Sequence, residues 1–158
     1  MALRLYNTLT SRVEDFVPLS DKIVKIYVCG PTVYDYCHMG HARAYVVFDT
    51  LRRYLLYKGY QVTYVQNFTD VDDKIIKRAG EKGVAPLELA NQFIDAYFED
   101  MDRLHVMRAD VHPRVSQNIP EIIDMVSKLI ESGHAYVSEG SVYFSIDSMK
   151  DKVGALSH

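Results

Sequence analysis

The chain has 158 residues, a net charge of −3, 48% apolar residues and 25% charged residues. At roughly 150 residues per domain, it is one domain or one large fragment, and its composition excludes a disordered, collagen-like or low-complexity chain. The charge disfavours a small basic nucleic-acid module, and two cysteines are too few for a disulfide scaffold. No apolar run is long enough to span a membrane and no signal-peptide core is present, so we expect a soluble cytoplasmic protein without membrane contact.

The first third of the chain has the pattern of a strand, a helix and a second strand. Residues 3–8 predict a short strand, and residues 23–29 are apolar and β-branched, which predicts a buried strand that Gly30 and Pro31 end. From His41 the apolar period becomes helical, and Gly59 would end the helix. The apolar residues that would share one helix face are Ala44, Val47, Phe48, Leu51, Tyr54 and Leu55. Residues 61–68 alternate as a strand does.

This strand–helix–strand order predicts an α/β fold with a parallel sheet, since the connecting helix is long enough for a crossover. Sites in such sheets lie outside the carboxyl ends of the strands, which here are Cys29–His41 and Asn67–Asp73. The rest of the chain predicts helices and a hairpin. The ranges are 71–82, 86–105 and 119–131 for helices, and 135–138 with 141–146 for the hairpin. A polar tail without a closing element follows from residue 147 to 158.

Two histidines mark the first of these strand ends. His38 and His41 stand three residues apart around Gly40, at the predicted start of a helix that follows a strand. A helix start offers free N–H groups and a positive dipole end, both suited to phosphate, and a glycine lets a ligand come close. Imidazoles can donate hydrogen bonds to phosphate oxygens as charge develops on them. The alternative interpretation is a helix start with two solvated histidines.

Three segments carry a family resemblance. The string His38-Met39-Gly40-His41 resembles the HIGH signature of class I aminoacyl-tRNA synthetases, although H-x-G-H by itself is weakly specific. The segments 5–10, 27–41 and 64–79 are similar to the cysteinyl-tRNA synthetase family in particular. The similarity runs from about residue 3 to residue 146. In combination, C-G-x-T-V-Y-D, H-x-G-H and N-x-T-D-V-D-D-K are a strong signal.

The resemblance implies a fold and a reaction. Residues 1–94 would form the first half of a Rossmann-like catalytic domain, and residues 95–158 the start of a connective insertion of helices and a hairpin. The implied activity joins L-cysteine and ATP, with Mg²⁺, into cysteinyl-adenylate and then transfers cysteine to tRNA(Cys). The family's KMSKS-type loop is not in this sequence, so we expect an amino-terminal fragment that is inactive alone. The full-length enzyme is expected to be a monomer.

The resemblance also implies roles for single residues. His38 and His41 would be catalytic and would bind ATP together with Gly40. Cys29, Gly30 and Thr69 would contact the amino acid. Cys29 would also be one ligand of Zn²⁺, a metal that favours thiolate over hydroxyl and so would select cysteine over serine. One cysteine cannot hold zinc, and the family's other ligands lie farther along the chain.

Other interpretations stay open at several positions. Cys29 by itself is compatible with a buried free cysteine, and Cys37 is expected to pack beside the histidine segment. The acidic run at 70–73 is compatible with magnesium but better explained by capping of a helix N-terminus. The basic residues Lys74, Lys77, Arg78 and Lys82 would face tRNA or solvent. No role is assigned to the remaining histidines, which are His105, His112, His134 and His158.

Two alternative functions accompany the first. One is a ligase that joins activated cysteine to a sugar amine, because such an enzyme would share the cysteine-binding and HIGH-like segments and lack an anticodon domain. The other is a non-catalytic paralogue that binds a nucleotide or a partner. The missing carboxyl-terminal sequence or dependence on tRNA would separate the first alternative from the synthetase, and a reading frame that ended at His158 would favour the second.

Overall fold

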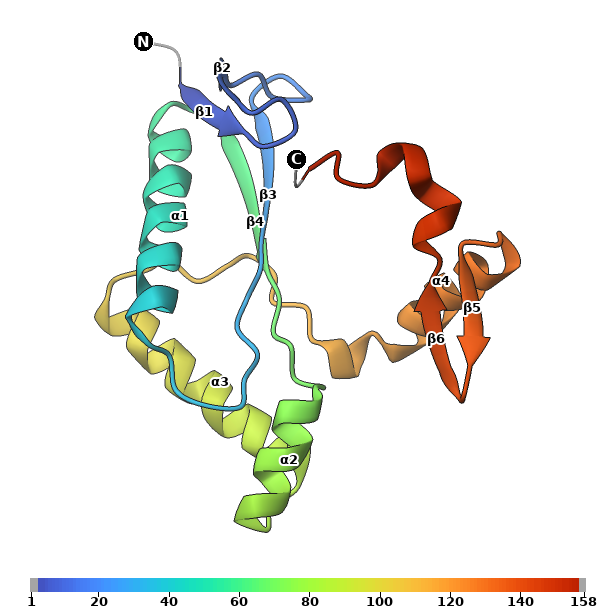
Figure 1. The fold of residues 1–158 in the computed structure, drawn as a ribbon. Coiled ribbons are helices and arrows are strands. Elements are labelled where there is room, and N and C mark those ends of the chain that lie inside the picture. Colours follow the sequence, from blue (N-terminus) through green and yellow to red (C-terminus); the bar gives the residue numbers. More distant parts are fainter. Residues whose placement is uncertain (1–2, 157–158) are drawn as a thin grey trace. The chain divides into compact units, whose positions relative to one another are not determined.

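The computed structural model describes residues 3–156, and Figure 1 shows its elements. The chain divides into two compact units. Residues 18–118 form one, and the residues up to 17 together with those from 119 onward form the other. The domain boundary that we predicted between residues 94 and 95 falls within a helix of the first of these units, and it stays a prediction. His158 lies outside the described residues.

The unit of residues 18–118 is built on two parallel strands. Strand β3 (Ile23–Val28) pairs with β4 (Gln61–Gln66), from Ile23 opposite Gln61 to Val28 opposite Gln66. Helix α1 (Met39–Tyr57) connects them and lies alongside both strands (Figure 1). The predicted strand–helix–strand unit is therefore confirmed, with its carboxyl strand ends at one edge.

Two helices follow β4 and cover the ends of the strands. They are α2 (Asp73–Lys82) and α3 (Pro86–Arg103), and proline begins α3 because its missing N–H is not needed there. A single hydrophobic core joins them to α1 and to the strands. Its buried members are Val28, Val33, Tyr45, Tyr64, Phe68, Ile75, Ala79, Leu89, Ala90, Phe93, Ile94, Tyr97 and Met101. Val33 and Phe68 belong to the segments just beyond the two strands, so the core holds those segments in place.

The buried face of α1 differs from the predicted one. Ala44, Val47 and Phe48 were expected inside, but they are exposed. The predicted Leu55 is buried. The other inward residues are Tyr45, Asp49 and Arg52. Hydrophobic periodicity missed this face because two of its members are charged.

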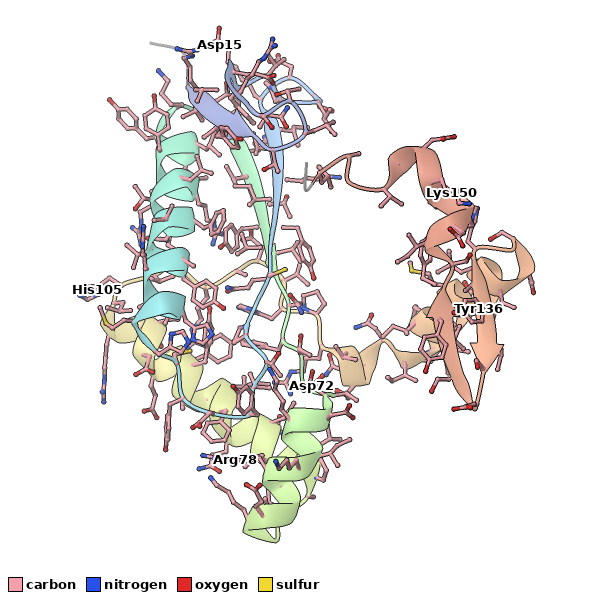
Figure 2. The ribbon with its side chains drawn as sticks, in the orientation of Figure 1. Asp15, Asp72, Arg78, His105, Tyr136 and Lys150 are labelled. Carbon is pink, nitrogen blue, oxygen red and sulfur yellow. The ribbon has the colours of Figure 1, made fainter. Side chains whose placement is uncertain are left out.

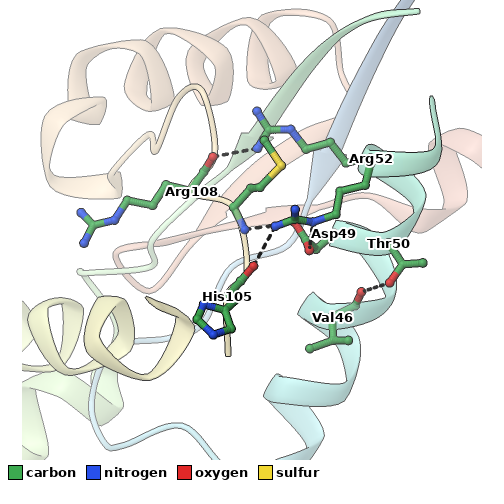
Figure 3. Close-up of polar contacts among 8 residues, drawn as sticks. Val46, Asp49, Thr50, Arg52, His105 and Arg108 are labelled. Atoms are coloured by element: carbon green, nitrogen blue, oxygen red, sulfur yellow. Dashed lines mark hydrogen bonds and ion pairs between the residues drawn. The ribbon is translucent and has the colours of Figure 1, made fainter. Parts of the chain in front are cut away.

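Hydrogen bonds explain why charged side chains occupy that face (Figure 3). The Arg52 guanidinium donates to the carbonyl of Arg108 at 2.7 Å and to Oδ1 of Asp110 at 2.8 Å. Asp49 accepts from the backbone N–H of Met107 at 3.0 Å. Buried charge is tolerated when it is paired in this way. The network therefore fixes α1 to the segment that follows α3.

That segment also extends the sheet beyond β4. The backbone N–H groups of Gln66 and Phe68 donate to the carbonyls of Val111 and Pro113, at 3.1 and 2.8 Å. Arg114 forms a parallel bridge with Phe68. The short 3₁₀ helix η1 (Val115–Gln117) follows. Residues 110–115 thus occupy the edge of β4 that β3 leaves free.

The second unit contains two hairpins and a helix. Strand β1 (Arg4–Asn7) pairs antiparallel with β2 (Arg12–Asp15), a strand that we did not predict and whose residues are all exposed. Helix α4 (Ile119–Glu131) has the bounds predicted, and β5 (Ala135–Ser138) and β6 (Ser141–Phe144) form the predicted hairpin. The 3₁₀ segment η2 (Ile146–Lys152) begins at the last residue of the predicted hairpin and continues into the predicted polar tail. Among the described residues, no helix is both long enough and apolar enough to cross a membrane.

Candidate functional site

The segments beyond β3 and β4 are held together by backbone hydrogen bonds. The N–H of Thr69 donates to the carbonyl of Pro31 at 3.1 Å, and the N–H of Val33 donates to the carbonyl of Thr69 at 3.2 Å. Thr32 and Thr69 form a parallel bridge there. The carboxyl ends of the strands therefore meet, as the parallel order predicted, and the pairing extends past the strands themselves.

At Gly30 the two chains come closer than an ordinary residue allows. A Cβ atom on Gly30 would lie 1.5 Å from the carbonyl oxygen of Asn67. The N–H of Gly30 donates to the side-chain Oδ1 of Asn67 at 2.9 Å. The side chain of Asn67 thus accepts the hydrogen bond from Gly30, in place of a backbone carbonyl. No role was predicted for Asn67, although a polar residue near the end of a strand is a signal for a site residue.

Thr69 and Asp70 have different surroundings. The hydroxyl oxygen of Thr69 accepts from Nδ2 of Asn67 at 3.3 Å, and the residue is half-buried. Asp70 is 2% exposed, and its carboxylate accepts from the N–H and the hydroxyl of Ser116, at 2.9 and 2.5 Å. Asp70 therefore fixes η1 to the end of β4. It does not cap α2; Asp72 does, by accepting from the N–H of Lys74 at 2.8 Å.

The two histidines cap the start of α1 reciprocally. Nδ1 of His38 accepts from the N–H of Gly40 at 3.0 Å, and Nδ1 of His41 accepts from the N–H of His38 at 3.2 Å. Their rings stack with centroids 4.0 Å apart. Two imidazoles here perform what a serine and a glutamate do in the usual capping box. Because both Nδ1 atoms accept, each neutral ring carries its proton on Nε2.

The same contacts favour the neutral form of His41. Partial burial, and then the neighbouring His38, lower the pKa of His41 from its usual value. Protonation at Nδ1 would also remove the acceptor that holds the N–H of His38. The pair therefore offers two Nε2–H donors, one from each ring.

A cavity of about 310 Å³ adjoins the histidines. Both histidines line it, together with Lys74 and the segment that follows β3. The ammonium of Lys74 lies 5.5 Å from the centre of the Tyr34 ring, and Asp35 is paired with Arg78 at 3.2 Å. The remaining lining residues are Pro31, Thr32, Tyr36 and Cys37. With Asp35 partly neutralised, the donors and the cation make the cavity suited to an anionic ligand.

Comparison with known proteins gives the family. The model of the class I (C) tRNA synthetase catalytic domain matches residues 15–158. The chain belongs to this family.

Individual relatives agree with the family model. The chain is 60% identical over 146 residues to the cysteine–tRNA ligase of Gloeobacter violaceus, covering 92% of this chain and 30% of the relative. With the ligase of Carboxydothermus hydrogenoformans, identity is 58% over 149 residues, covering 94% and 32%. The chain thus spans about a third of these relatives' length.

A solved structure supports the fold. Methionyl-tRNA synthetase of Mycobacterium tuberculosis, determined with methionyl-adenylate, superposes with a TM-score of 0.61 at 15% identity. The match covers 77% of this chain and 28% of the other. The predicted first half of a class I synthetase catalytic domain is therefore confirmed as the fold class.

The two cysteines of this chain differ in exposure. Cys29 is exposed directly after β3. Cys37 packs against the core, as expected, and burial raises the pKa of its thiol to about 11, with Asp100 contributing. In residues 3–156, no three histidine, cysteine or acidic side chains gather as a metal site would require. The described residues therefore do not fit a complete zinc centre, and Cys29 is at most one ligand.

The basic residues of α2 are partly engaged. Besides the contacts of Lys74 and Arg78, the ammonium of Lys82 lies 5.2 Å from the centre of the Phe93 ring. Figure 2 labels Asp72 and Arg78 at this helix. Whether the helix faces tRNA stays a prediction.

His112 should make the stability of this unit depend on pH. Its ring stacks on Phe68 with centroids 5.0 Å apart, and Nδ1 donates to the carbonyl of Gln66 at 2.9 Å. Burial is the main cause that lowers the pKa of His112. The unfolded chain then binds the proton more readily, so the free energy of unfolding should fall as pH drops through about 6.5. His41 contributes in the same direction.

Urea unfolding between pH 5 and 8 would measure this effect. His112→Gln should flatten the slope of unfolding free energy against pH. His105→Asn is the matched control, because His105 is exposed and has a positive φ of 56° that asparagine tolerates. A His112→Gln slope as steep as that of the unchanged chain would contradict the assignment.

Proposed function

We propose that the protein containing these residues activates L-cysteine with ATP and transfers it to tRNA(Cys). The observation that carries the proposal is the reciprocal histidine cap beside the joined strand ends, which offers two N–H donors next to a cavity suited to an anion. The matched relatives named cysteine–tRNA ligase supply the amino acid and the acceptor. A tRNA substrate would place the protein in the cytoplasm, and we retain a monomer as the expected state of the full-length enzyme.

The reaction has two steps. A carboxylate oxygen of cysteine attacks the α-phosphorus of ATP, and the bond to the β-phosphate oxygen breaks to release pyrophosphate. A hydroxyl of the terminal tRNA ribose then attacks the carbonyl carbon, and AMP leaves as the hydroxyl proton is lost. The nucleotide and the amino acid carry the reacting bonds, so the protein contributes chiefly position and electrostatics.

The chain's own residues would act on the first step. His38 and His41 would donate from Nε2 to phosphate oxygens as negative charge builds on them. Gly40 has no side chain: a Cβ there would lie 2.8 Å from Cε1 of His38, so glycine leaves the ring in its capping position. Magnesium would accompany ATP as part of the substrate.

Cys29, Gly30 and Thr69 would contact the amino acid. We keep Cys29 as one ligand of a zinc ion whose other ligands would come from the remainder of the protein. The test is the zinc content of the purified full-length protein. Cys29→Ser should lower it from about one equivalent to near zero, whereas Cys37→Ser should leave it unchanged because that thiol is packed against the core.

Substitutions at His38 separate its two roles. In the full-length protein, His38→Asn keeps an acceptor for the N–H of Gly40 but removes the Nε2 donor. We expect cysteine-dependent exchange of pyrophosphate into ATP to fall about 10²–10³-fold, the usual cost of one such donor, with little change in stability. His38→Ala should lose the same activity and also about 1 kcal/mol of stability, because the cap is lost.

Two results would contradict the proposed function. Absence of cysteine-dependent exchange in the unchanged full-length protein would favour a non-catalytic role. Exchange followed by transfer to a sugar amine in place of tRNA would assign the protein to the other ligase class. Wild-type exchange in His38→Asn would remove that imidazole from the chemistry.

A further inference from the structure

Asn67 links two residues that the proposed function places on the amino acid. Its Oδ1 accepts from the N–H of Gly30 at 2.9 Å, and its Nδ2 donates to Oγ1 of Thr69 at 3.3 Å. The orientation of the amide is settled by chemistry: an N–H group needs an oxygen acceptor, so Oδ1 faces Gly30 and Nδ2 faces Thr69. The side chain is half-buried between two strand ends.

The backbones of Gly30 and Asn67 come unusually close at this point. A Cβ atom on Gly30 would lie only 1.5 Å from the carbonyl oxygen of Asn67, so no side chain fits there. Gly30 therefore meets Asn67 twice: it packs closely against the Asn67 backbone, and its N–H donates to the Asn67 amide. Cys29 precedes Gly30 directly, so its backbone is held as well.

The bond to Thr69 has a further consequence. A threonine hydroxyl has one hydrogen to donate and two lone pairs to accept with. Because Nδ2 of Asn67 donates to Oγ1, the hydroxyl hydrogen of Thr69 makes no hydrogen bond to Asn67. It remains available to an acceptor atom.

We propose that Asn67 is a positioning residue for the amino acid: it fixes the Cys29–Gly30 backbone relative to Thr69 and leaves the Thr69 hydroxyl as a donor toward a substrate oxygen. This inference rests on the proposed function. Asn67 acts through its two neighbours and touches no reacting atom. Its loss should therefore weaken the binding of cysteine while ATP binding is kept.

The test uses pyrophosphate exchange by the full-length protein. Asn67→Ala should raise the KM for cysteine about tenfold and leave the KM for ATP within about twofold. Asn67→Asp keeps an acceptor for the N–H of Gly30, but it takes the hydroxyl hydrogen of Thr69, so the KM for cysteine should rise here too. Asn91→Ala, at an exposed asparagine of α3, is the matched control and should leave both constants unchanged.

A double-mutant cycle with Thr69→Val tests whether Asn67 acts through Thr69. If it does, the effect of Asn67→Ala on the KM for cysteine should be smaller in the Thr69→Val background than in the wild type. An unchanged KM for cysteine in Asn67→Ala, a wild-type KM in Asn67→Asp, or fully additive effects would each overturn the inference while the proposed function stands. An unchanged protein without cysteine-dependent exchange would overturn both.

Discussion

Gly30→Ala should lower the free energy of unfolding by about 3 kcal/mol, at the upper end of what overpacking usually costs. The new Cβ would stand 1.5 Å from the carbonyl oxygen of Asn67. This atom belongs to the backbone and cannot rotate away. The strand ends would have to separate, and the bond from the N–H of Gly30 to Asn67 would be lost with them.

Urea unfolding of the 158-residue chain would measure this cost. The matched control is Gly80→Ala in the interior of α2, where a Cβ would meet nothing within 4 Å. There, alanine should stabilise the chain by about 0.5–1 kcal/mol, because it restricts the unfolded state and favours helix. If both substitutions shift the unfolding midpoint in the same direction, the close approach at Gly30 is not as the structure has it.

Arg52→Ala should cost about 1.5–3 kcal/mol, because it removes the charge-assisted hydrogen bonds of a buried guanidinium whose partner Asp110 is itself 43% exposed. The side chain of Arg52 is 6% exposed and lies 2.8 Å from Asp110. Asp110 also accepts from the N–H of Tyr64 at 2.7 Å, so it connects α1 to β4. Without the guanidinium, this carboxylate and the carbonyl of Arg108 lose their donor.

An exposed ion pair provides the comparison. Lys128 and Asp124 are 2.6 Å apart on α4, with side chains 69% and 62% exposed. Such helix pairs contribute about 0.3–0.5 kcal/mol, so Lys128→Ala should be nearly neutral. The comparison is made by urea unfolding, and equal losses in the two variants would contradict the structural role given to Arg52.

Much of the fold could be predicted because it depends on near neighbours in the chain. The helix at 119–131 has the bounds predicted from the sequence. Asp72 caps α2 because a carboxylate two residues before a free N–H can reach it. The site segments could be located as well, since a parallel order brings strand ends to one edge whatever the side chains are.

The tertiary structure decided the rest, because it depends on residues far apart in sequence. Which face of α1 is buried follows from Asp110 and Arg108, more than fifty residues away in sequence, and no local periodicity contains them. Asp70 was expected at a helix cap and instead binds Ser116, 46 residues later. The role of Asn67 depends on the approach of Gly30 across the sheet. The sequence by itself therefore determined most of the elements, their order and the family, whereas packing decided which polar side chains hold the site together.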